Sequence, residues 1–274
     1  MRSQNPHSRV QLIFMRGSKS YLTRIVSIII FLLLWEIIAI LVSRPRLLPT
    51  PVDVAIALKD LLFAPGPSEI GWAGELFGNT LVSLGRVATG FCIAAVSGIS
   101  LGILMGWWRT LRNLVEPILE IIRPIPPLAW IPLAILWFGL GFKPAVFLIW
   151  LGAFFPILLN TILGLESTPK VLIEAAKTLG AKSKHLLLKV VMPSAIPSIL
   201  VGIKVGFGVG WMCLIAAELS GSNSGLGFMI IFYNWAMEPA KTIAGMLMIG
   251  IVGLLMFEVL NRIENRLLRW KEAV

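Results

Sequence analysis

The chain has 274 residues, of which 57% are hydrophobic and only 14% are charged, and its mean hydropathy is +0.87. This composition excludes an ordinary soluble domain, because a folded chain of this length needs far more charge on its surface. Several apolar runs approach or exceed the roughly 20 residues that cross a bilayer core. The net charge of +10 could suggest nucleic acid, but the basic residues cluster in loops beside apolar runs, where they set membrane topology. We therefore predict an all-α polytopic membrane protein and no nucleic acid partner.

The first apolar run, Ile25 to Val42, follows a basic N-terminal segment, 1–24. This arrangement resembles a signal peptide, but the run is too long and no small-residue cleavage site follows it. We predict an uncleaved first span at 25–43 and a cytoplasmic basic segment before it. Glu36 lies near the middle of this span, and we assign it no role.

A Pro- and Gly-bearing loop at 44–78 follows the first span. Within it we expect a short helix at 52–63, because Thr50 is a good cap and Pro51 suits the first helical turn.

The second predicted span, 79–107, carries a small residue at every fourth position. These residues are Ala94, Gly98, Gly102 and Gly106. Such a stripe lets the backbone of another helix come close, and ordinary bundle packing is sufficient to explain it.

The next segment, 109–124, is amphipathic, and we place it at the cytoplasmic interface. The third span, 125–141, is short and contains Pro126, Pro127 and Pro132. Proline at membrane depth frees backbone carbonyls, which must be buried in protein or face a cavity. A short span interrupted by proline either points to a transport pathway or is a simple packing kink.

The remaining spans are expected at 144–164, 194–218 and 241–260. A polar segment, 165–193, separates the first two of these. A Gly/Ser/Asn-rich loop begins at Ser220 and precedes an apolar stretch that ends at Trp235.

The distribution of Lys and Arg gives the orientation. With both termini in the cytoplasm, the inner segments hold seventeen of these residues and the outer loops five. Arg86 and Lys204 fall within spans. Basic residues are enriched in cytoplasmic loops, so we predict six spans with both termini inside.

The polar segment 165–193 has the pattern of two cytoplasmic helices. Thr168 and Pro169 are typical of a helix start, and Gly180 of the left-handed residue that ends one. Between them Leu172, Ala175, Ala176 and Leu179 share one face, while Glu174 and Lys177 point away from the membrane side. Ser183 can cap a second helix, Lys184 to Val191, before Pro193 leads into the fifth span. From these residues alone, partner docking and a solvated loop helix remain equally good interpretations.

The full spacing of this segment resembles the cytoplasmic signature of bacterial ABC importer permeases. That signature reads Glu-Ala-Ala, three residues, Gly, nine residues, then aliphatic, any residue, aliphatic and Pro. Here it is formed by Glu174, Ala175, Ala176, Gly180, Val190, Met192 and Pro193. The run that begins Arg123-Pro124-Ile125-Pro126-Pro127 and the run Ala216-Ala217-Glu218-Leu219 are similar to the nitrate/sulfonate/taurine/bicarbonate branch.

The resemblance implies a type I importer permease fold in the bacterial or archaeal plasma (inner) membrane. It also implies a homodimer of permeases, two cytoplasmic ATPases and an extracytoplasmic solute-binding protein, surrounded by lipid. The coupling residues carried over from the signature are Glu174, Ala175, Ala176, Leu179, Gly180 and Pro193. The branch suggests a small oxyanion, such as nitrate, bicarbonate or a sulfonate, and a non-anionic solute such as a vitamin precursor stays open.

The chain carries no Gly-rich loop ending in Gly-Lys-Ser/Thr, the motif that holds nucleotide phosphates. We therefore expect no enzymatic activity and no cofactor on this chain, with ATP and Mg²⁺ on the partner ATPase. It has only two histidines, and we predict no metal site.

Charges inside spans are candidates for a pathway or gate. Arg86 and Glu218 lie toward the outer ends of their spans and either pair with each other or line the pathway. Lys204 either extends its amine toward the cytoplasm or lines the pathway, where it and Arg86 would favour an anion. Trp211 is the fourth candidate. A secondary transporter would need intramembrane acidic relays or inverted repeats, and we find neither.

Overall fold

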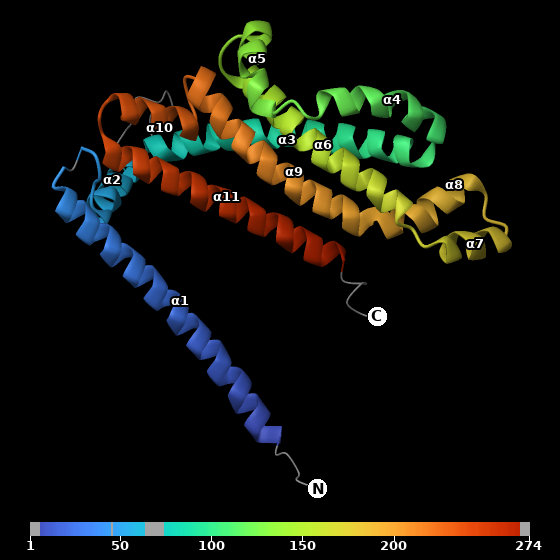
Figure 1. Ribbon diagram of the computed structural model, residues 1–274, viewed down its shortest axis with the longest axis horizontal. Helices are drawn as coiled ribbons and strands as arrows, with labels where there is room; N and C mark the ends of the chain where they lie inside the picture. The colour runs from blue at the N-terminus through green and yellow to red at the C-terminus, as the bar shows by residue number, and fades with distance from the viewer. Residues whose placement is uncertain (1–5, 45, 64–73, 269–274) are drawn as a thin grey trace.

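The computed structural model describes residues 6–44, 46–63 and 74–268. Within these ranges every regular element is helical (Figure 1). The predictions for the N-terminal Arg2, for part of the 44–78 loop and for the tail residues Arg269 and Lys271 lie outside the described residues, as do the side chains of 6–22 and 24.

Helix α1 (Pro6–Val42) contains the first predicted span and begins well before it. Figure 1 shows that it projects away from the other helices, and only 6% of the window Ile25–Val42 is buried. The short helix α2 (Pro51–Phe63) follows. Its predicted cap is confirmed, because the Thr50 hydroxyl accepts the Asp53 N–H while the Asp53 carboxylate accepts the Thr50 N–H. This reciprocal arrangement satisfies two donors at the helix start.

The bundle is built around α3 (Glu75–Trp107), α6 (Phe142–Glu166) and α9 (Met192–Gly221). The predicted small-residue stripe on α3 packs against α6, as expected for close backbone approach. A Cβ atom added to Gly102 would lie 2.6 Å from the Cβ atom of Thr161. Gly98 faces Ile157 and Gly106 faces Leu165. Because residue numbers rise together along both helices, α3 and α6 run parallel.

Two parallel spans require the chain between them to return across the bundle. This return is made by α4 (Arg109–Ile122), a 3₁₀ turn η1 (Pro127–Trp130) and α5 (Ile131–Phe138). The two halves meet at an angle of 79°. Among the described residues, five helices are long and apolar enough to cross a membrane, and the bent pair, taken as one span, makes six.

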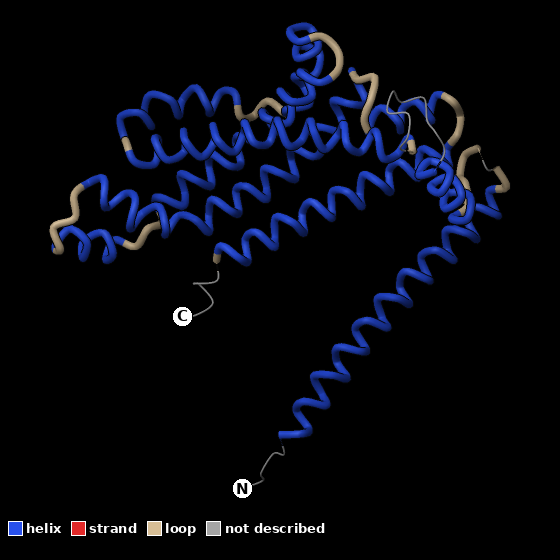
Figure 2. The backbone as a smooth tube through the Cα atoms, turned by 180° about the vertical axis from the view of Figure 1, so that it is seen from behind, coloured by secondary structure: helices blue, strands red, loops and turns tan. Residues whose placement is uncertain are grey.

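The predicted bounds of the third span were therefore wrong. Residues 109–124 do not lie only at the cytoplasmic interface, because α4 runs back along α3 and α6 (Figure 2). Its residues Val115 and Leu119 pack against the core that α3 and α6 share. Its 14 residues span roughly 21 Å at 1.5 Å per residue. Arg123, which we counted as cytoplasmic, instead lies at the far end of α4. The orientation stands, because one residue does not alter an imbalance of seventeen to five.

The outer connection between the last two spans is α10 (Leu226–Trp235), which packs against α11 (Pro239–Leu267). Tyr233 on α10 donates a hydrogen bond to the Glu75 carboxylate at the start of α3. Burial, then this hydrogen bond to Glu75, raises the pKa of the Tyr233 phenol. The phenol therefore stays protonated as a donor throughout the physiological pH range.

Candidate functional site

Helix α7 (Lys170–Thr178) lies at the end of the bundle opposite α10, in the loop between α6 and α9 (Figure 1). None of its residues is buried. Leu179 is 88% exposed and Val171 is 73% exposed. The apolar face that we expected on the membrane side therefore has no partner within the described chain. Glu174 and Ala175 are exposed as well, so this surface is available to another protein.

The C-terminus of α7 is closed by the predicted glycine. Gly180 has φ +78°, and its N–H donates to the Lys177 carbonyl while the Ala181 N–H donates to the Ala176 carbonyl. These two bonds form a Schellman motif, which satisfies carbonyls at a helix end. The motif fixes Leu179 at the tip of the exposed face. We define the exposed residues Val171, Glu174, Ala175 and Leu179, a set that differs from the predicted apolar face, as the α7 surface.

The start of α7 and the helix after it differ from the prediction. The helix begins at Lys170 with Pro169 in the capping position, and the Thr168 hydroxyl is buried without a hydrogen-bond partner in the described chain. Thr168 as the cap was therefore wrong. Lys182, not Ser183, precedes the next helix.

The second helix is not a separate short element. Helix α8 (Ser183–Leu186) continues through a π-helical turn, η2 (Leu187–Val191), directly into α9. Pro193 is the second residue of α9, which begins directly after the π-helical turn. It is half-buried at this junction and is not part of the α7 surface. The π turn links α8 to the fifth span as one continuous helix of 39 residues.

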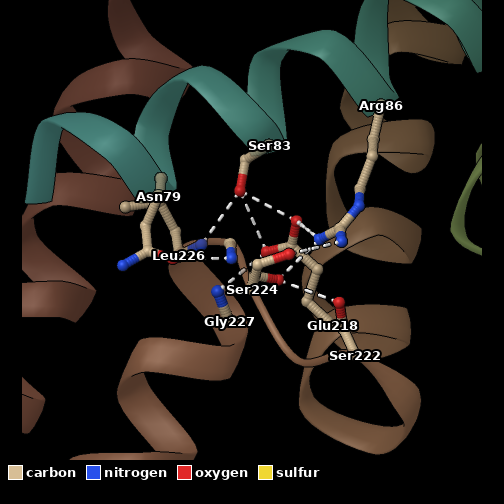
Figure 3. A network of polar contacts seen from close by, with 9 residues as sticks. Asn79, Ser83, Arg86, Glu218, Ser222, Ser224, Leu226 and Gly227 are labelled. Carbon is tan, nitrogen blue, oxygen red and sulfur yellow. Dashed lines mark hydrogen bonds and ion pairs between the residues drawn. The ribbon is translucent and has the colours of Figure 1, made fainter. Parts of the chain in front are cut away.

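The outer ends of α3 and α9 are joined by a buried polar network (Figure 3). The Arg86 guanidinium forms an ion pair with Glu218 at 2.7 Å, and these side chains are 3% and 0% exposed. The predicted pairing of the two residues is confirmed. Glu218 also accepts hydrogen bonds from the Ser83 hydroxyl and the Gly227 N–H.

The same network holds the loop before α10. Arg86 donates to the Ser224 carbonyl, Ser83 accepts the Leu226 N–H, and Asn79 accepts the Gly225 N–H. Gly225 has φ +106°, and an added Cβ would lie 2.2 Å from a Glu218 oxygen. Only glycine fits here. Neither charged group has side-chain surface left for a solute in this conformation.

Sequence reasoning singled out Arg86 and Glu218 but missed their partners. Asn79, Ser83 and Arg86 recur at three or four residues along α3, which places them on one helix face. A polar stripe on one face of an otherwise apolar span could have identified Asn79 and Ser83 from the sequence. The loop serine and the backbone donors could not be found, because their contacts depend on how α10 folds back.

The other two pathway candidates are also engaged within the protomer. The Lys204 amine pairs with Glu264 near the end of α11. The Trp211 ring stacks on Phe207 at 6.2 Å and lies over Gly253 of α11. Both residues therefore connect α9 to α11.

Another ion pair connects the cytoplasmic ends of α4 and α6. Arg112 pairs with Glu166, the last residue of α6, and with Glu116 at 3.1 Å. The prediction did not include this pair, which lies three residues before the cap of α7.

The comparisons with known proteins agree with this geometry. Residues 98–271 match the family model described as binding-protein-dependent transport system inner membrane component. The chain is 45% identical to a putative ABC transporter permease protein of Methanocaldococcus jannaschii, with 88% of this chain and 89% of the relative covered.

Several relatives are named for a substrate, including a sulfonate and a bicarbonate permease. A putative aliphatic sulfonates transport permease of Bacillus subtilis is 36% identical (89% of this chain, 86% of the relative). A bicarbonate transport system permease of Synechococcus elongatus is 37% identical (88% of this chain, 85% of the relative).

Among solved structures, the MetNI methionine ABC transporter matches with a TM-score of 0.61 and 22% identity, over 70% of this chain and 94% of that chain. At this identity the match shows the fold, which is that of a type I importer permease.

Proposed function

The chain belongs to the family of binding-protein-dependent transport system inner membrane components, and we propose that it carries a small oxyanion into the cytoplasm. It is the permease subunit of an ABC importer, a multi-pass protein of the inner membrane, and not an enzyme. Its partners are an ATPase and a solute-binding protein. The relatives named for sulfonates and bicarbonate support an oxyanion as the solute.

The α7 surface carries our proposal for coupling. Its side chains are apolar and exposed, with a single acidic group, Glu174. A solvent-exposed apolar patch rimmed by polar residues is typical of a protein interaction site. We place the partner ATPase on this surface, with ATP and Mg²⁺ bound by that partner. ATP then shifts the permease between states only if it binds one state of the complex more tightly than the other.

Helix α1 and the break between α4 and α5 in the third span support assembly with a second copy. Most of the α1 segment Ile25–Val42 is exposed in the single protomer, and its apolar side chains require lipid or protein around them. We place two copies of this chain around one pathway, with α1 in contact with lipid and the second copy.

Co-purification tests the coupling proposal. A tagged permease should retain the ATPase, and the substitutions Glu174→Arg and Leu179→Glu together should abolish its retention. Lys184→Gln on the neighbouring α8 is a matched exposed control and should leave retention unchanged. Full retention by the α7 double variant would contradict docking on this surface. Identification of the neighbouring solute-binding protein and its ligand tests the oxyanion: a neutral ligand would contradict it.

A further inference from the structure

Basic residues lie in the interior of α3, in the interior of α9 and at the break between α4 and α5, and two of these three are neutralised. Arg86 is paired with Glu218, and Lys204 is paired with Glu264. The third is Arg123, which follows the last residue of α4. It is exposed, and its side chain has no hydrogen bond or ion pair among the described residues.

The position of Arg123 along the bundle follows from α4. Arg112 marks the cytoplasmic end, because it pairs with the last residue of α6. Arg123 is eleven residues farther along the same helix, which is roughly 16 Å at 1.5 Å per residue. The hydrocarbon core is about 30 Å thick. Arg123 therefore lies near the middle of the bilayer.

The backbone beside Arg123 is also unsuited to lipid. Residues 124–126 are not helical and are exposed, and the carbonyls of Pro124 and Ile125 accept no backbone hydrogen bond in the described chain. Irregular backbone at membrane depth is tolerated only where protein buries it or water fills a cavity. An unpaired guanidinium has the same requirement, since a charge facing hydrocarbon is costly. The break in the third span therefore faces protein or water and not lipid.

We propose that Arg123 is the residue of the translocation pathway that recognises the anionic group of the solute. Its planar fork of five N–H donors matches the oxygens of a carboxylate, sulfonate or bicarbonate. The free carbonyls of Pro124 and Ile125, which follow Arg123, disfavour an anion at their own position and so confine binding to the guanidinium. This inference rests on the proposed function and names the solute-recognising group within it.

Cysteine labelling in the intact ATPase complex tests this inference without knowledge of the solute. The native thiols Cys92 and Cys213 are first replaced by Ser and Ala. Ile125→Cys then reports on the break, because Ile125 is 43% exposed two residues from Arg123. Two membrane-impermeant methanethiosulfonate reagents of matched size are compared, one bearing a sulfonate and the other a quaternary ammonium, with and without ATP.

We expect the sulfonate reagent to react faster, by about fivefold or more given the Coulomb energy of a nearby charge. Arg123→Gln should abolish this preference, and Arg123→Lys should retain part of it. Arg109→Gln, an exposed arginine at the other end of α4, is the matched control and should retain all of it. The proposal fails if only a membrane-permeant maleimide reacts, or if Arg123→Gln leaves the preference unchanged. Retention of the ATPase, measured on the same samples, reports separately on the proposed function.

Discussion

The Arg112 side chain on α4 forms an ion pair with Glu166, the final residue of α6. Glu166 lies three residues before Pro169, the cap of α7. Arg112 lies on α4, the helix whose C-terminal cap is Arg123. The pair therefore joins the segment proposed to dock the ATPase to the segment proposed to line the pathway. Both side chains are partly exposed, at 30% and 41%.

The pair should matter more for coupling than for stability. Exposed ion pairs contribute about 0.2–1 kcal/mol to folding, so we expect Arg112→Gln to shift the thermal unfolding midpoint by little. Solute uptake per ATP hydrolysed should fall severalfold, because α4 no longer follows α6. Reconstituted vesicles measure both quantities, and charge exchange, Arg112→Glu with Glu166→Arg, should restore part of the coupling. Arg262→Gln, which removes an exposed pair on α11, is the control. An unchanged coupling ratio in Arg112→Gln would contradict this role.

The outer network should dominate the stability of the protomer. Glu218→Gln leaves the buried Arg86 charge without its partner, which typically costs about 3–5 kcal/mol. We expect a clearly lower unfolding midpoint in detergent, and a smaller loss when Arg86→Gln is added, because no buried charge then remains. Glu258→Gln, in an exposed pair, should change little. A double variant less stable than either single variant would show that the charge is not the cause.

Gly180 should be required for its backbone conformation and not for space. Nothing lies within 4 Å of a Cβ atom built there, but φ is +78°, and the left-handed region costs a side-chain-bearing residue about 1–2 kcal/mol. Asparagine tolerates this region better than alanine, and valine tolerates it least. Retention of the ATPase should therefore decline from Gly180 through Asn and Ala to Val. Equal retention by all three variants would mean that the end of α7 does not shape the docking surface.

The pair between Lys204 and Glu264 should hold α9 to α11 without selecting the solute. Because each charge neutralises the other, removing both through Lys204→Ala and Glu264→Ala should leave oxyanion uptake near the unsubstituted level. Lys204→Ala alone should lower the free energy of unfolding, because it leaves the Glu264 carboxylate, which is 17% exposed, without its partner. Uptake measurements with a labelled sulfonate and with bicarbonate decide this. Loss of uptake in the double variant would indicate that Lys204 lines the pathway.

The sequence by itself determined the class and the orientation, and it located the exposed helical segment that we propose for coupling. These features are local or additive properties of the chain, so they can be recognised without knowledge of the fold. They are the apolar runs of membrane length, the imbalance of basic residues and the glycine that closes α7. Residues such as Thr50 and Gly180 act on their own neighbours in the chain, and the structure shows both in the expected roles.

Only the tertiary structure decided which charges inside the membrane are free. Sequence could not show that Lys204 reaches Glu264, sixty residues away, or that Ser83 and Ser224 complete the Arg86 network. It also misplaced Arg123, because the parallel packing of α3 on α6 requires α4 to cross back through the bundle. Pairing between distant residues depends on how helices are arranged, and that arrangement left the Arg123 side chain without an ion-pair partner among the described residues.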